Sequence, residues 1–365
     1  MIKVLQVYPQ MNNAGTEKVI MTLYKNIDRT KVTFDFLVQK DGLLDNEILT
    51  LGGKIYKIAF VNKRQYYNEL VDFLKKSEYK IMHVHTQGNM ELILKAGKEA
   101  GIKCRIIHSH NARQDLLPLL KILTLKRNFK IKKYATDFFA CSTDAAKWLF
   151  PFNYNDAKIV YNAVNVEKFS FDKNIRKIER EKLNISENER VIVNVGRFAR
   201  QKNHKKIFEI AKQLIKEDKN IKILLIGEGP LKEKIIKKVK NNKMDSNFIF
   251  TGNRTDVNNL LMAGDLFLFP SFHEGLGIVL VEAQFSGLRC VASNNVPLEA
   301  DIGMGLMKRI SLHRTNKYWA KYIMKNLTVT TLKRENLVYD IENSNYNIKN
   351  IINGIEDFYI GKAGN

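Results

Sequence analysis

Two acidic side chains near the start of one predicted helix suggest a site for a ligand rich in hydroxyl groups. Residues 269–283 have the sequence Phe-Pro-Ser-Phe-His-Glu-Gly-Leu-Gly-Ile-Val-Leu-Val-Glu-Ala, with Glu274 before a glycine-containing helix start and Glu282 inside the helix. We expect apolar neighbours to surround Glu282, and a carboxylate in such surroundings must be paired or bound. Because carboxylates accept hydrogen bonds from adjacent hydroxyls, this pattern favours a ribose or hexose ligand.

Two cations follow another predicted strand and could hold a diphosphate. The sequence Val-Gly-Arg-Phe-Ala-Arg-Gln-Lys-Asn-His places Gly196, Arg197 and Lys202 in one loop before a helix. A guanidinium binds phosphate oxygens in a bidentate manner, whereas an ammonium acts as a point charge. Solvated surface charge is the ordinary alternative. The glycine and the position after a buried-looking strand favour a binding site.

A third candidate loop follows the first predicted strand. Residues 9–17 are Pro-Gln-Met-Asn-Asn-Ala-Gly-Thr-Glu, and Thr16 is the expected N-cap of the helix that follows. Free N–H groups at a helix start bind anions, and Gly15 would let a phosphate approach the backbone. A structural turn without a ligand explains this loop equally well. The sequence lacks the G-x-G-x-x-G and G-K-[ST] patterns of dinucleotide and P-loop sites.

Alternating β-rich and helical segments must position these loops. Short β-rich runs alternate with longer segments of helical spacing, which predicts an α/β fold with parallel sheets. The predicted strands are 3–8, 32–38, 54–58, 81–84, 104–108, 137–140, 158–161, 190–195, 221–226, 247–250, 266–269 and 289–291. The alternation is interrupted near 166–185 and then restarts. We therefore expect two doubly wound domains.

The expected domains are 1–170 and 186–344, joined by a linker at 171–185. In doubly wound sheets, ligands bind beyond the carboxyl ends of the strands. Two such domains in tandem predict a site in a central cleft between them.

Charge and composition narrow the class of partner. The 365 residues include 60 Lys+Arg against 38 Asp+Glu, a net charge of +22. Such an excess indicates an anionic partner, which could be a nucleic acid, an anionic lipid or a phosphorylated small molecule. We expect no secretion leader and no membrane-spanning helix. Three cysteines without paired spacing favour a reducing compartment.

Together these motifs resemble the large family-four group of retaining glycosyltransferases with the GT-B fold. Glu274-x7-Glu282, the Arg197-x4-Lys202 loop and the Gly15 loop occur in the family's order. Further matching segments are 107–111, 140–143, 161–165, 226–230 and 250–252. Ala163 and Asn165 replace the usual Gly and Asp of one segment, and Asn13-Ala14 replaces a Gly pair. Segments 105–111, 282–290 and 297–302 are most similar to bacterial capsular and exopolysaccharide enzymes.

This resemblance implies a set of roles in binding a nucleotide diphosphate sugar, with a UDP-sugar expected. Arg197 and Lys202 would hold and neutralise the diphosphate, Glu282 would bind the ribose, and Glu274 would contact the transferred sugar. The remaining donor-binding residues implied are Gly15, Thr16, Gly196, Gly275, Leu276, Gly277 and Ile278. His110 would lie near the reacting sugar, with His108 as the alternative.

The resemblance also implies retention of anomeric configuration, with no obligatory metal or other cofactor. His204 and His273 stay unassigned neighbours of the site, and Glu299 would either border the base pocket or cap a helix. A C-terminal helix at about 345–365 would return to the N-terminal domain, as is typical of the fold.

One basic segment suggests contact with a membrane surface. Residues 113–133, from Arg113 to Lys133, combine leucines with many cations. Such a stretch can lie on an anionic leaflet, or it can pack its leucines on the sheet. Because the resembling enzymes act on polyprenyl-linked glycan acceptors, we favour a cytoplasmic enzyme peripheral to the inner face of the membrane.

Three other classes of function agree less well with the sequence. A nucleic-acid-binding protein is compatible with the charge, but the sequence has no zinc-finger spacing, RNP-like motif or basic arm. A catalytically silent partner is disfavoured by the intact Arg197, Lys202, Glu274 and Glu282. An epimerase or phosphorylase on the same scaffold is disfavoured by the E-x7-E spacing, although the fold alone would not separate them.

Overall fold

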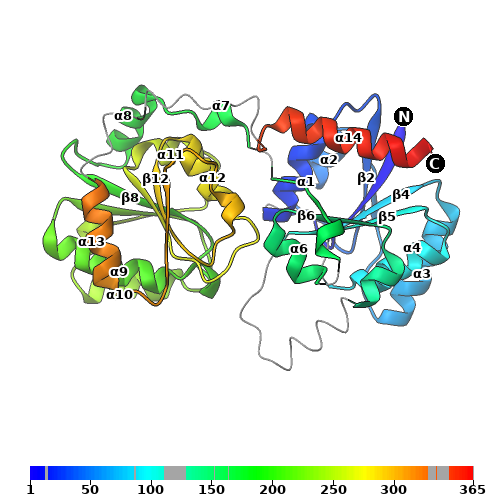
Figure 1. The fold of residues 1–365 in the computed structure, drawn as a ribbon, viewed down its shortest axis with the longest axis horizontal. Helices are drawn as coiled ribbons and strands as arrows, with labels where there is room; N and C mark the ends of the chain where they lie inside the picture. The colour runs from blue at the N-terminus through cyan, green and yellow to red at the C-terminus, as the bar shows by residue number, and fades with distance from the viewer. Residues whose placement is uncertain are drawn as a thin grey trace. The chain divides into compact units, whose positions relative to one another are not determined.

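Two compact units make up this chain. The computed structural model describes residues 1–12, 15–85, 88–110, 129–151, 153–162, 164–327, 334 and 345–364. The first unit comprises Met1–Ala163 and Asn345–Asn365, and the second comprises Val164–Ser344. Each unit is built on one parallel sheet flanked by helices (Figure 1).

The first unit contains a parallel sheet of order β3-β2-β1-β4-β5-β6-β7. Its strands are β1 (Ile2–Val7), β2 (Val32–Val38), β3 (Ile55–Lys57), β4 (Ile81–Val84), β5 (Cys104–Ser109), β6 (Asp137–Ala140) and β7 (Lys158–Ile159). Every residue of β2 and of β4 is buried. Burial on both faces is the expected environment for a parallel strand between two layers of helices.

Helices cover this first sheet, and one of them comes from the far end of the chain. The helices are α1 (Gly15–Asn26), α2 (Asp45–Thr50), α3 (Lys63–Lys76), α4 (Met90–Glu99), α6 (Thr143–Leu149), the 3₁₀ turn η1 (Tyr154–Asp156) and α14 (Ile348–Gly364). Helix α14 packs on α1 and on strands β1, β2 and β4 (Figure 1). Its Glu356 accepts a hydrogen bond from the Asp28 amide, 328 residues away in sequence, at 2.6 Å.

The second unit repeats the same topology. Its sheet has the order β10-β9-β8-β11-β12-β13, with parallel pairing throughout. The strands are β8 (Arg190–Val195), β9 (Ile221–Ile226), β10 (Phe248–Gly252), β11 (Leu266–Phe269), β12 (Arg289–Ser293) and β13 (Met307–Ile310). The helices are α7 (Val166–Phe169), α8 (Lys173–Lys182), α9 (His204–Glu217), α10 (Lys232–Asn241), α11 (Val257–Ala263), α12 (Ile278–Phe285) and α13 (Asn316–Leu327), with 3₁₀ turns η2 (Arg200–Lys202), η3 (Asp245–Asn247) and η4 (Leu298–Ala300).

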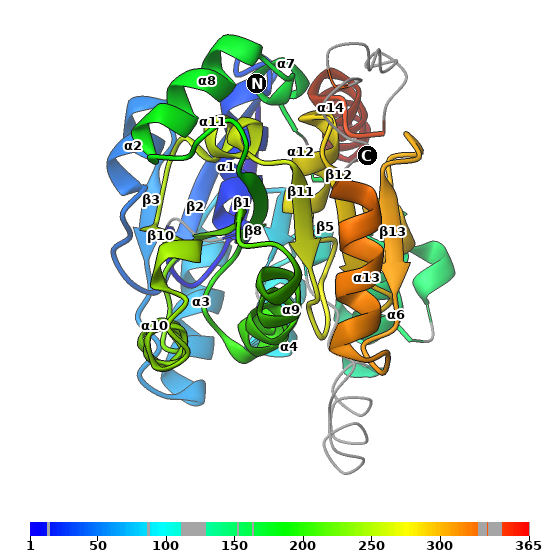
Figure 2. The same ribbon diagram turned by 90° about the vertical axis from the view of Figure 1, so that its left-hand side faces the viewer.

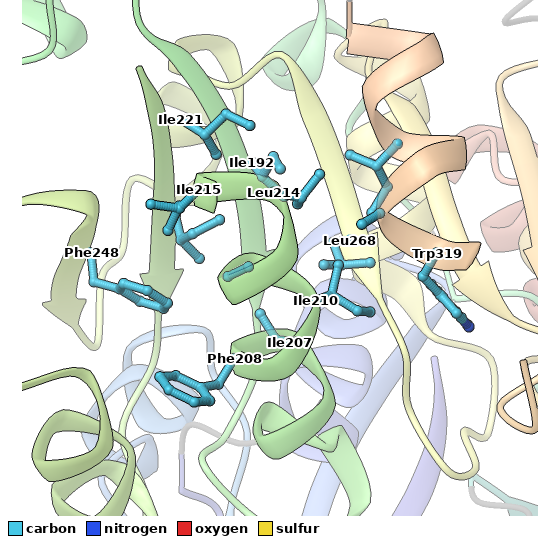
Figure 3. Close-up of a cluster of buried hydrophobic side chains, with 14 of the residues drawn as sticks. Ile192, Ile207, Phe208, Ile210, Leu214, Ile215, Ile221, Phe248, Leu268 and Trp319 are labelled. Carbon is cyan, nitrogen blue, oxygen red and sulfur yellow. The ribbon is translucent and has the colours of Figure 1, made fainter. Parts of the chain in front are cut away.

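The core of the second unit lies between its sheet and helices α9 and α13. These two helices lie side by side over one face of the sheet (Figure 2). Apolar residues of α9, such as Ile207, Ile210 and Leu214, meet Leu268 of β11, while Trp319 of α13 closes one end of the cluster (Figure 3). Amphipathic spacing along α9 thus fixes its face toward the sheet.

The predicted strands are all present, with ends shifted by two residues at most. Strand β13 was not predicted, because Met-Lys-Arg-Ile is a short, charged segment at the edge of the sheet. The prediction of Thr16 as an N-cap is wrong, since α1 already begins at Gly15. Among the described residues, no helix is long and apolar enough to cross a membrane.

The predicted linker at 171–185 is also wrong. This segment contains α8, which packs on α11 within the second unit. Arg176 and Arg180 of α8 bind Asp265 at 2.6 and 3.5 Å, and Asp265 also accepts the Val191 amide at 2.7 Å. The charge run that suggested a solvated linker therefore supplies buried partners for a buried carboxylate.

We predict that Asp265→Asn destabilises the second unit by about 3–5 kcal/mol, because it leaves the buried Arg180 without its counter-charge. Urea unfolding followed by circular dichroism measures this loss. Asp256→Asn is the control, since Asp256 pairs with Arg254 at the surface and should cost at most about 1 kcal/mol. Equal losses in the two variants would contradict a structural role for the α8 contact.

Candidate functional site

The predicted site residues gather where the strand order of each sheet reverses. Each sheet runs outward in both directions from its first strand, so neighbouring loops diverge at the pairs β1/β4 and β8/β11. Ligands of doubly wound folds bind at this point, beyond the carboxyl ends of the strands. The Gly196–Lys202 loop follows β8 and the Glu274 loop follows β11, whereas the Gly15 loop and His110 follow β1 and β5.

A buried ion pair joins the two loops of the second unit. Lys202 Nζ lies 2.8 Å from Glu274 Oε1, and the two side chains are only 17% and 6% exposed. Gln201 donates to the other Glu274 oxygen at 3.3 Å. The Lys202 ammonium also lies 4.6 Å above the ring of Phe269. The sequence predicted both charges, and the structure shows that they neutralise each other.

Backbone hydrogen bonds hold the same two loops together. The Phe272 amide donates to the Gln201 carbonyl at 2.8 Å, and Gln201 Nε2 donates to the His273 carbonyl at 2.9 Å. Asn203, in the left-handed conformation, caps α9 and donates to the Pro270 carbonyl at 3.0 Å. The ion pair therefore sits on a backbone that is fixed before any ligand arrives.

Gly196 lies against the stem of the Lys202 side chain. A Cβ at Gly196 would lie 3.1 Å from Lys202 Cγ and Cδ, closer than ordinary packing allows. Behind it, a Cβ on Gly227 would meet the Gly196 carbonyl at 2.3 Å. The glycine that the sequence offered as room for a phosphate thus first makes room for the lysine stem.

Arg197 is placed differently from Lys202. Its side chain is exposed, and no hydrogen bond or ion pair engages it within the described ranges. The structure therefore brings Lys202 to Glu274 and leaves Arg197 directed to solvent at the start of the same loop. An exposed guanidinium beside a buried ion pair is available to an incoming anion.

Glu282, the second predicted carboxylate, lies on a partly exposed face of α12. Glu274, Gly275 and Leu276 are buried, but Glu282 is only half-buried, so the expectation that apolar residues enclose it is wrong. The buried residues of α12 include the neighbours on either side of Glu282, which are Val281 and Ala283.

Helix α12 begins with an unusual turn. Gly277 caps it in the left-handed conformation, with φ of 82°. Ile278, its first residue, is half-buried, and the Leu280 amide bonds back to the Gly277 carbonyl at 2.8 Å. The left-handed turn is a position where a side chain is strained, and this accounts for the glycine.

In the first unit, Gly15 begins α1 and its neighbour Glu17 is a residue that the sequence analysis did not assign. A Cβ on Gly15 would meet no atom within 4 Å, so packing does not require glycine there. Thr16 is half-buried. Glu17 is 5% exposed, its Oε2 has no hydrogen-bond partner in the described chain, and burial raises the pKa of its carboxyl.

His110 belongs to a group of four imidazoles at the ends of β4 and β5, of which His83, His85 and His108 are buried and His110 is half-buried. His85 Nδ1 lies 2.8 Å from His110 Nε2, and His83 Nε2 lies 3.2 Å from His108 Nδ1. We refer to these four side chains as the histidine array. Its His83, His85 and His108 place ring nitrogens within 4.8 Å of one another, close enough to be considered as metal ligands.

Burial keeps the histidine array uncharged. It lowers the pKa values of His83, His85 and His108 well below the usual range and that of His110 to about 3. His83 and His85 were not predicted from the sequence. The detectable signal was the repeated His-x-His pattern, because a two-residue period puts both histidines of a strand on one face.

The predicted membrane segment lies mostly outside the described residues, which resume at Phe129. His204, left unassigned, stacks on Phe198 with ring centroids 4.0 Å apart, and burial lowers its pKa to about 4. The half-buried Glu299 lies inside the turn η4.

Comparisons with known proteins identify the family. The family model described as glycosyl transferases group 1 matches residues 175–323. The putative glycosyltransferase EpsF of Bacillus subtilis (strain 168) is 30% identical over 373 residues, covering 98% of this chain and 96% of its own. The chain therefore belongs to the group 1 glycosyltransferases.

Further relatives and solved structures agree with this assignment. The capsular polysaccharide biosynthesis glycosyltransferase CapH of Staphylococcus aureus is 25% identical, covering 89% of this chain and 90% of its own. The Anabaena protein Alr3699/HepE in complex with UDP aligns with a TM-score of 0.80 at 14% identity, over 99% of this chain and 100% of that one. WaaG, described as a glycosyltransferase involved in lipopolysaccharide biosynthesis, gives a TM-score of 0.72 at 15% identity, over 97% and 95%. The predicted GT-B fold of two Rossmann-like domains is confirmed.

The neutral histidine array predicts a loss of stability in acid. Its pKa values are lowered by folding, so the unfolded chain takes up protons below about pH 6.5 while the folded chain does not. Stability should therefore be complete well above pH 6.5 and, well below it, fall by about 1.4 kcal/mol per pH unit for each such histidine. Urea titrations between pH 7.5 and 5.5 measure this slope.

The variant His83→Asn should reduce that slope by the contribution of one histidine. An unchanged slope in the variant, or a wild-type stability independent of pH over this range, would contradict the burial of neutral imidazoles.

Proposed function

We propose that this glycosyltransferase transfers a hexose from a UDP-sugar to a polyprenyl-linked glycan during assembly of a bacterial surface polysaccharide, with retention of anomeric configuration. The observation that carries the proposal is the buried Lys202–Glu274 pair at the switch point of the second unit. This ion pair is little exposed, it is held by two rigid loops, and an exposed arginine lies in one of them. A charged ligand can bind there by replacing one partner of the pair.

In this proposal the diphosphate of the donor binds beside Lys202 and Arg197. Lys202 is already neutralised by Glu274, so an arriving diphosphate competes for the ammonium, and Arg197 supplies a further positive charge. The amino end of α12, which starts at Ile278 after the left-handed Gly277, adds the positive end of a helix dipole. The same charges stabilise the diphosphate as it leaves, and this is the electrostatic part of catalysis.

Glu274 then has oxygens available for the sugar. A carboxylate accepts hydrogen bonds from adjacent hydroxyls, and the buried backbone of Gly275 and Leu276 borders the same place. Glu282, at the rim of the helix, is placed to accept the ribose hydroxyls. For the first unit we propose that His110 contacts the transferred sugar and that the Gly15–Thr16 start of α1 contributes free amides for the phosphates. We propose no obligatory metal or cofactor, because Lys202 and Arg197 provide the positive charge.

Names of relatives support the donor and the acceptor. A relative 26% identical over 233 residues, covering 62% of this chain and 60% of its own, is the Escherichia coli UDP-Gal:alpha-D-GlcNAc-diphosphoundecaprenol alpha-1,3-galactosyltransferase. The Anabaena structure holds UDP, and a second one of the same protein holds UDP-glucose. CapH is named for capsular polysaccharide biosynthesis. We therefore propose UDP as the nucleotide and a lipid-linked acceptor for this chain as well.

A lipid-linked acceptor also favours a cytoplasmic enzyme at the inner face of the membrane. The net charge of +22 would attract the protein to an anionic leaflet, and residues 113–133 concentrate cations among leucines.

We predict that the wild type binds UDP and UDP-sugars but not GDP in calorimetric titrations, and that EDTA leaves transfer intact. Lys202→Ala should weaken UDP binding at least about tenfold, because the phosphates lose a charge-assisted contact. Glu274→Gln should keep UDP binding within about threefold and lower the rate of sugar transfer, since its proposed partner is the sugar.

Lys205→Ala is the matched control, because Lys205 is an exposed lysine of the same helix region. UDP binding that is absent from the folded wild type, or unchanged in Lys202→Ala, would contradict the proposal. Proton NMR of the product decides between retention and inversion.

We predict salt-sensitive binding to vesicles that contain phosphatidylglycerol, measured by cosedimentation. Replacing Lys121, Lys126 and Arg127 by Gln should reduce this binding at least about fivefold, because each cation near an anionic surface contributes on the order of 1 kcal/mol. The control replaces Lys234, Lys237 and Lys240 of α10 by Gln. Equal effects of the two triple substitutions would contradict a specific role for residues 113–133.

A further inference from the structure

The histidine array consists of two hydrogen-bonded pairs of rings, one pair stacked on the other. His83 and His108 form an inner pair, with planes 14° apart, and His85 and His110 form an outer pair, with planes 28° apart. The ring centroids are 5.3 Å apart in the inner pair and 5.1 Å apart in the outer pair. In each pair this separation exceeds the distance between the facing nitrogens by about the width of an imidazole ring. The two rings of a pair therefore lie edge to edge, with nitrogens facing each other.

This geometry holds protons and does not suit a metal ion. Two nitrogen ligands of a tetrahedral ion lie roughly 3.3 Å apart, but their lone pairs converge on the ion, which lies off the line between them. In each pair here the two nitrogens face each other along that line, which leaves no position for an ion. The observed distances are 2.8 and 3.2 Å, which are those of N–H···N hydrogen bonds. A neutral imidazole carries a proton on only one of its two nitrogens. A ring that donates from one nitrogen therefore accepts at the other, and all hydrogen bonds along a pair point the same way.

Gln6 sets the direction in the outer pair. Its Oε1 lies 2.7 Å from His85 Nε2, and a carbonyl oxygen only accepts, so His85 carries its proton on Nε2. His85 Nδ1 is then bare and must accept from His110 Nε2. His110 is left with a bare Nδ1, which has no hydrogen-bond partner in the described part of the chain.

The inner pair runs the other way. Tyr359 of α14 lies 2.6 Å from His83 Nδ1. Burial raises the pKa of Tyr359, so its hydroxyl keeps its proton and can donate to His83 Nδ1, while Gln6 Nε2 has no hydrogen-bond partner in the described part of the chain. The Tyr359 proton then points to His83, whose own Nε2 proton points to His108. His108 consequently keeps a proton on Nε2, beside the bare nitrogen of His110.

We propose that Gln6 and His85 are positioning residues that hold His110 in the tautomer protonated on Nε2, so that its Nδ1 accepts a hydrogen bond from a hydroxyl of the bound sugar. This inference rests on the proposed function, in which His110 lies at the transferred sugar. A sugar hydroxyl can donate to the bare nitrogen, whereas a deoxy or fluoro analogue cannot. The array would therefore contribute to choice among donors at that hydroxyl.

The tautomer is tested directly by two-bond ¹H–¹⁵N correlation spectra of the full chain labelled with ¹⁵N-histidine. We expect His110, assigned by loss of its signals in His110→Gln, to show a protonated Nε2 and an unprotonated Nδ1. A protonated Nδ1 on His110 in the wild type overturns the proposal, whatever the chain catalyses.

Two substitutions of Gln6 connect the tautomer with activity. Gln6→Leu should give a mixture of His110 tautomers and lower kcat/KM by about tenfold while UDP affinity stays unchanged. Gln6→Glu should keep the wild-type tautomer and activity at alkaline pH. The new carboxylate should also raise the pKa of His85. A protonated His85 donates to His110 and reverses the bond between them, so kcat/KM should fall on the acidic side of its pH profile.

Phe139→Leu is the packing control, since Phe139 contacts the rings of His83 and His108 without bonding to the outer pair. It should leave the His110 tautomer and kcat/KM unchanged. A Gln6→Leu enzyme with mixed tautomers and wild-type kcat/KM, or the same loss of kcat/KM in Phe139→Leu, overturns the role of the tautomer in sugar binding. If no nucleotide sugar is a substrate, the proposed function fails, while the spectra still decide the tautomer.

Discussion

Reversal of strand order within a parallel sheet is the constraint on which the rest of this structure depends. In both units the chain winds outward from its first strand in two directions, so the loops after adjacent strands separate at β1/β4 and at β8/β11. Hydrogen bonding of parallel strands fixes the ends of those strands relative to one another. Short loops after these strands therefore bring side chains that are distant in sequence, such as Lys202 and Glu274, into contact.

Charge is handled differently in the two units. The second unit buries ionised groups and pairs them, as in the Lys202–Glu274 bridge and in the contacts of Asp265 with two arginines of α8. In the first unit the histidine array stays neutral, because desolvation lowers the pKa values of its members. A pair of opposite charges suits exchange with a charged ligand, whereas neutral imidazoles hold directed hydrogen bonds.

Membership of the group 1 glycosyltransferases gives these features a common setting. The family motif accounts for the two loops of the second unit, where the rigid backbone between Gln201 and Phe272 holds the ion pair. The histidine array also depends on the last helix of the chain, since Tyr359 of α14 closes its inner pair. The return of α14 to the first unit thus fixes a side chain of the histidine array as well as covering the sheet.

The sequence by itself determined the α/β class, the strands and the loops that carry the candidate site, because periodicity and the residues at strand ends are local properties. It placed Glu274, Lys202 and His110 correctly at strand ends. Only the tertiary structure decided that Lys202 and Glu274 neutralise each other, that Glu282 lies at a rim and that 171–185 is a packed helix. It also decided that His83, His85, His108 and His110 form one array. Ion pairing and proton direction depend on distances between residues far apart in the chain, and these arise when the parallel strands and their loops come together.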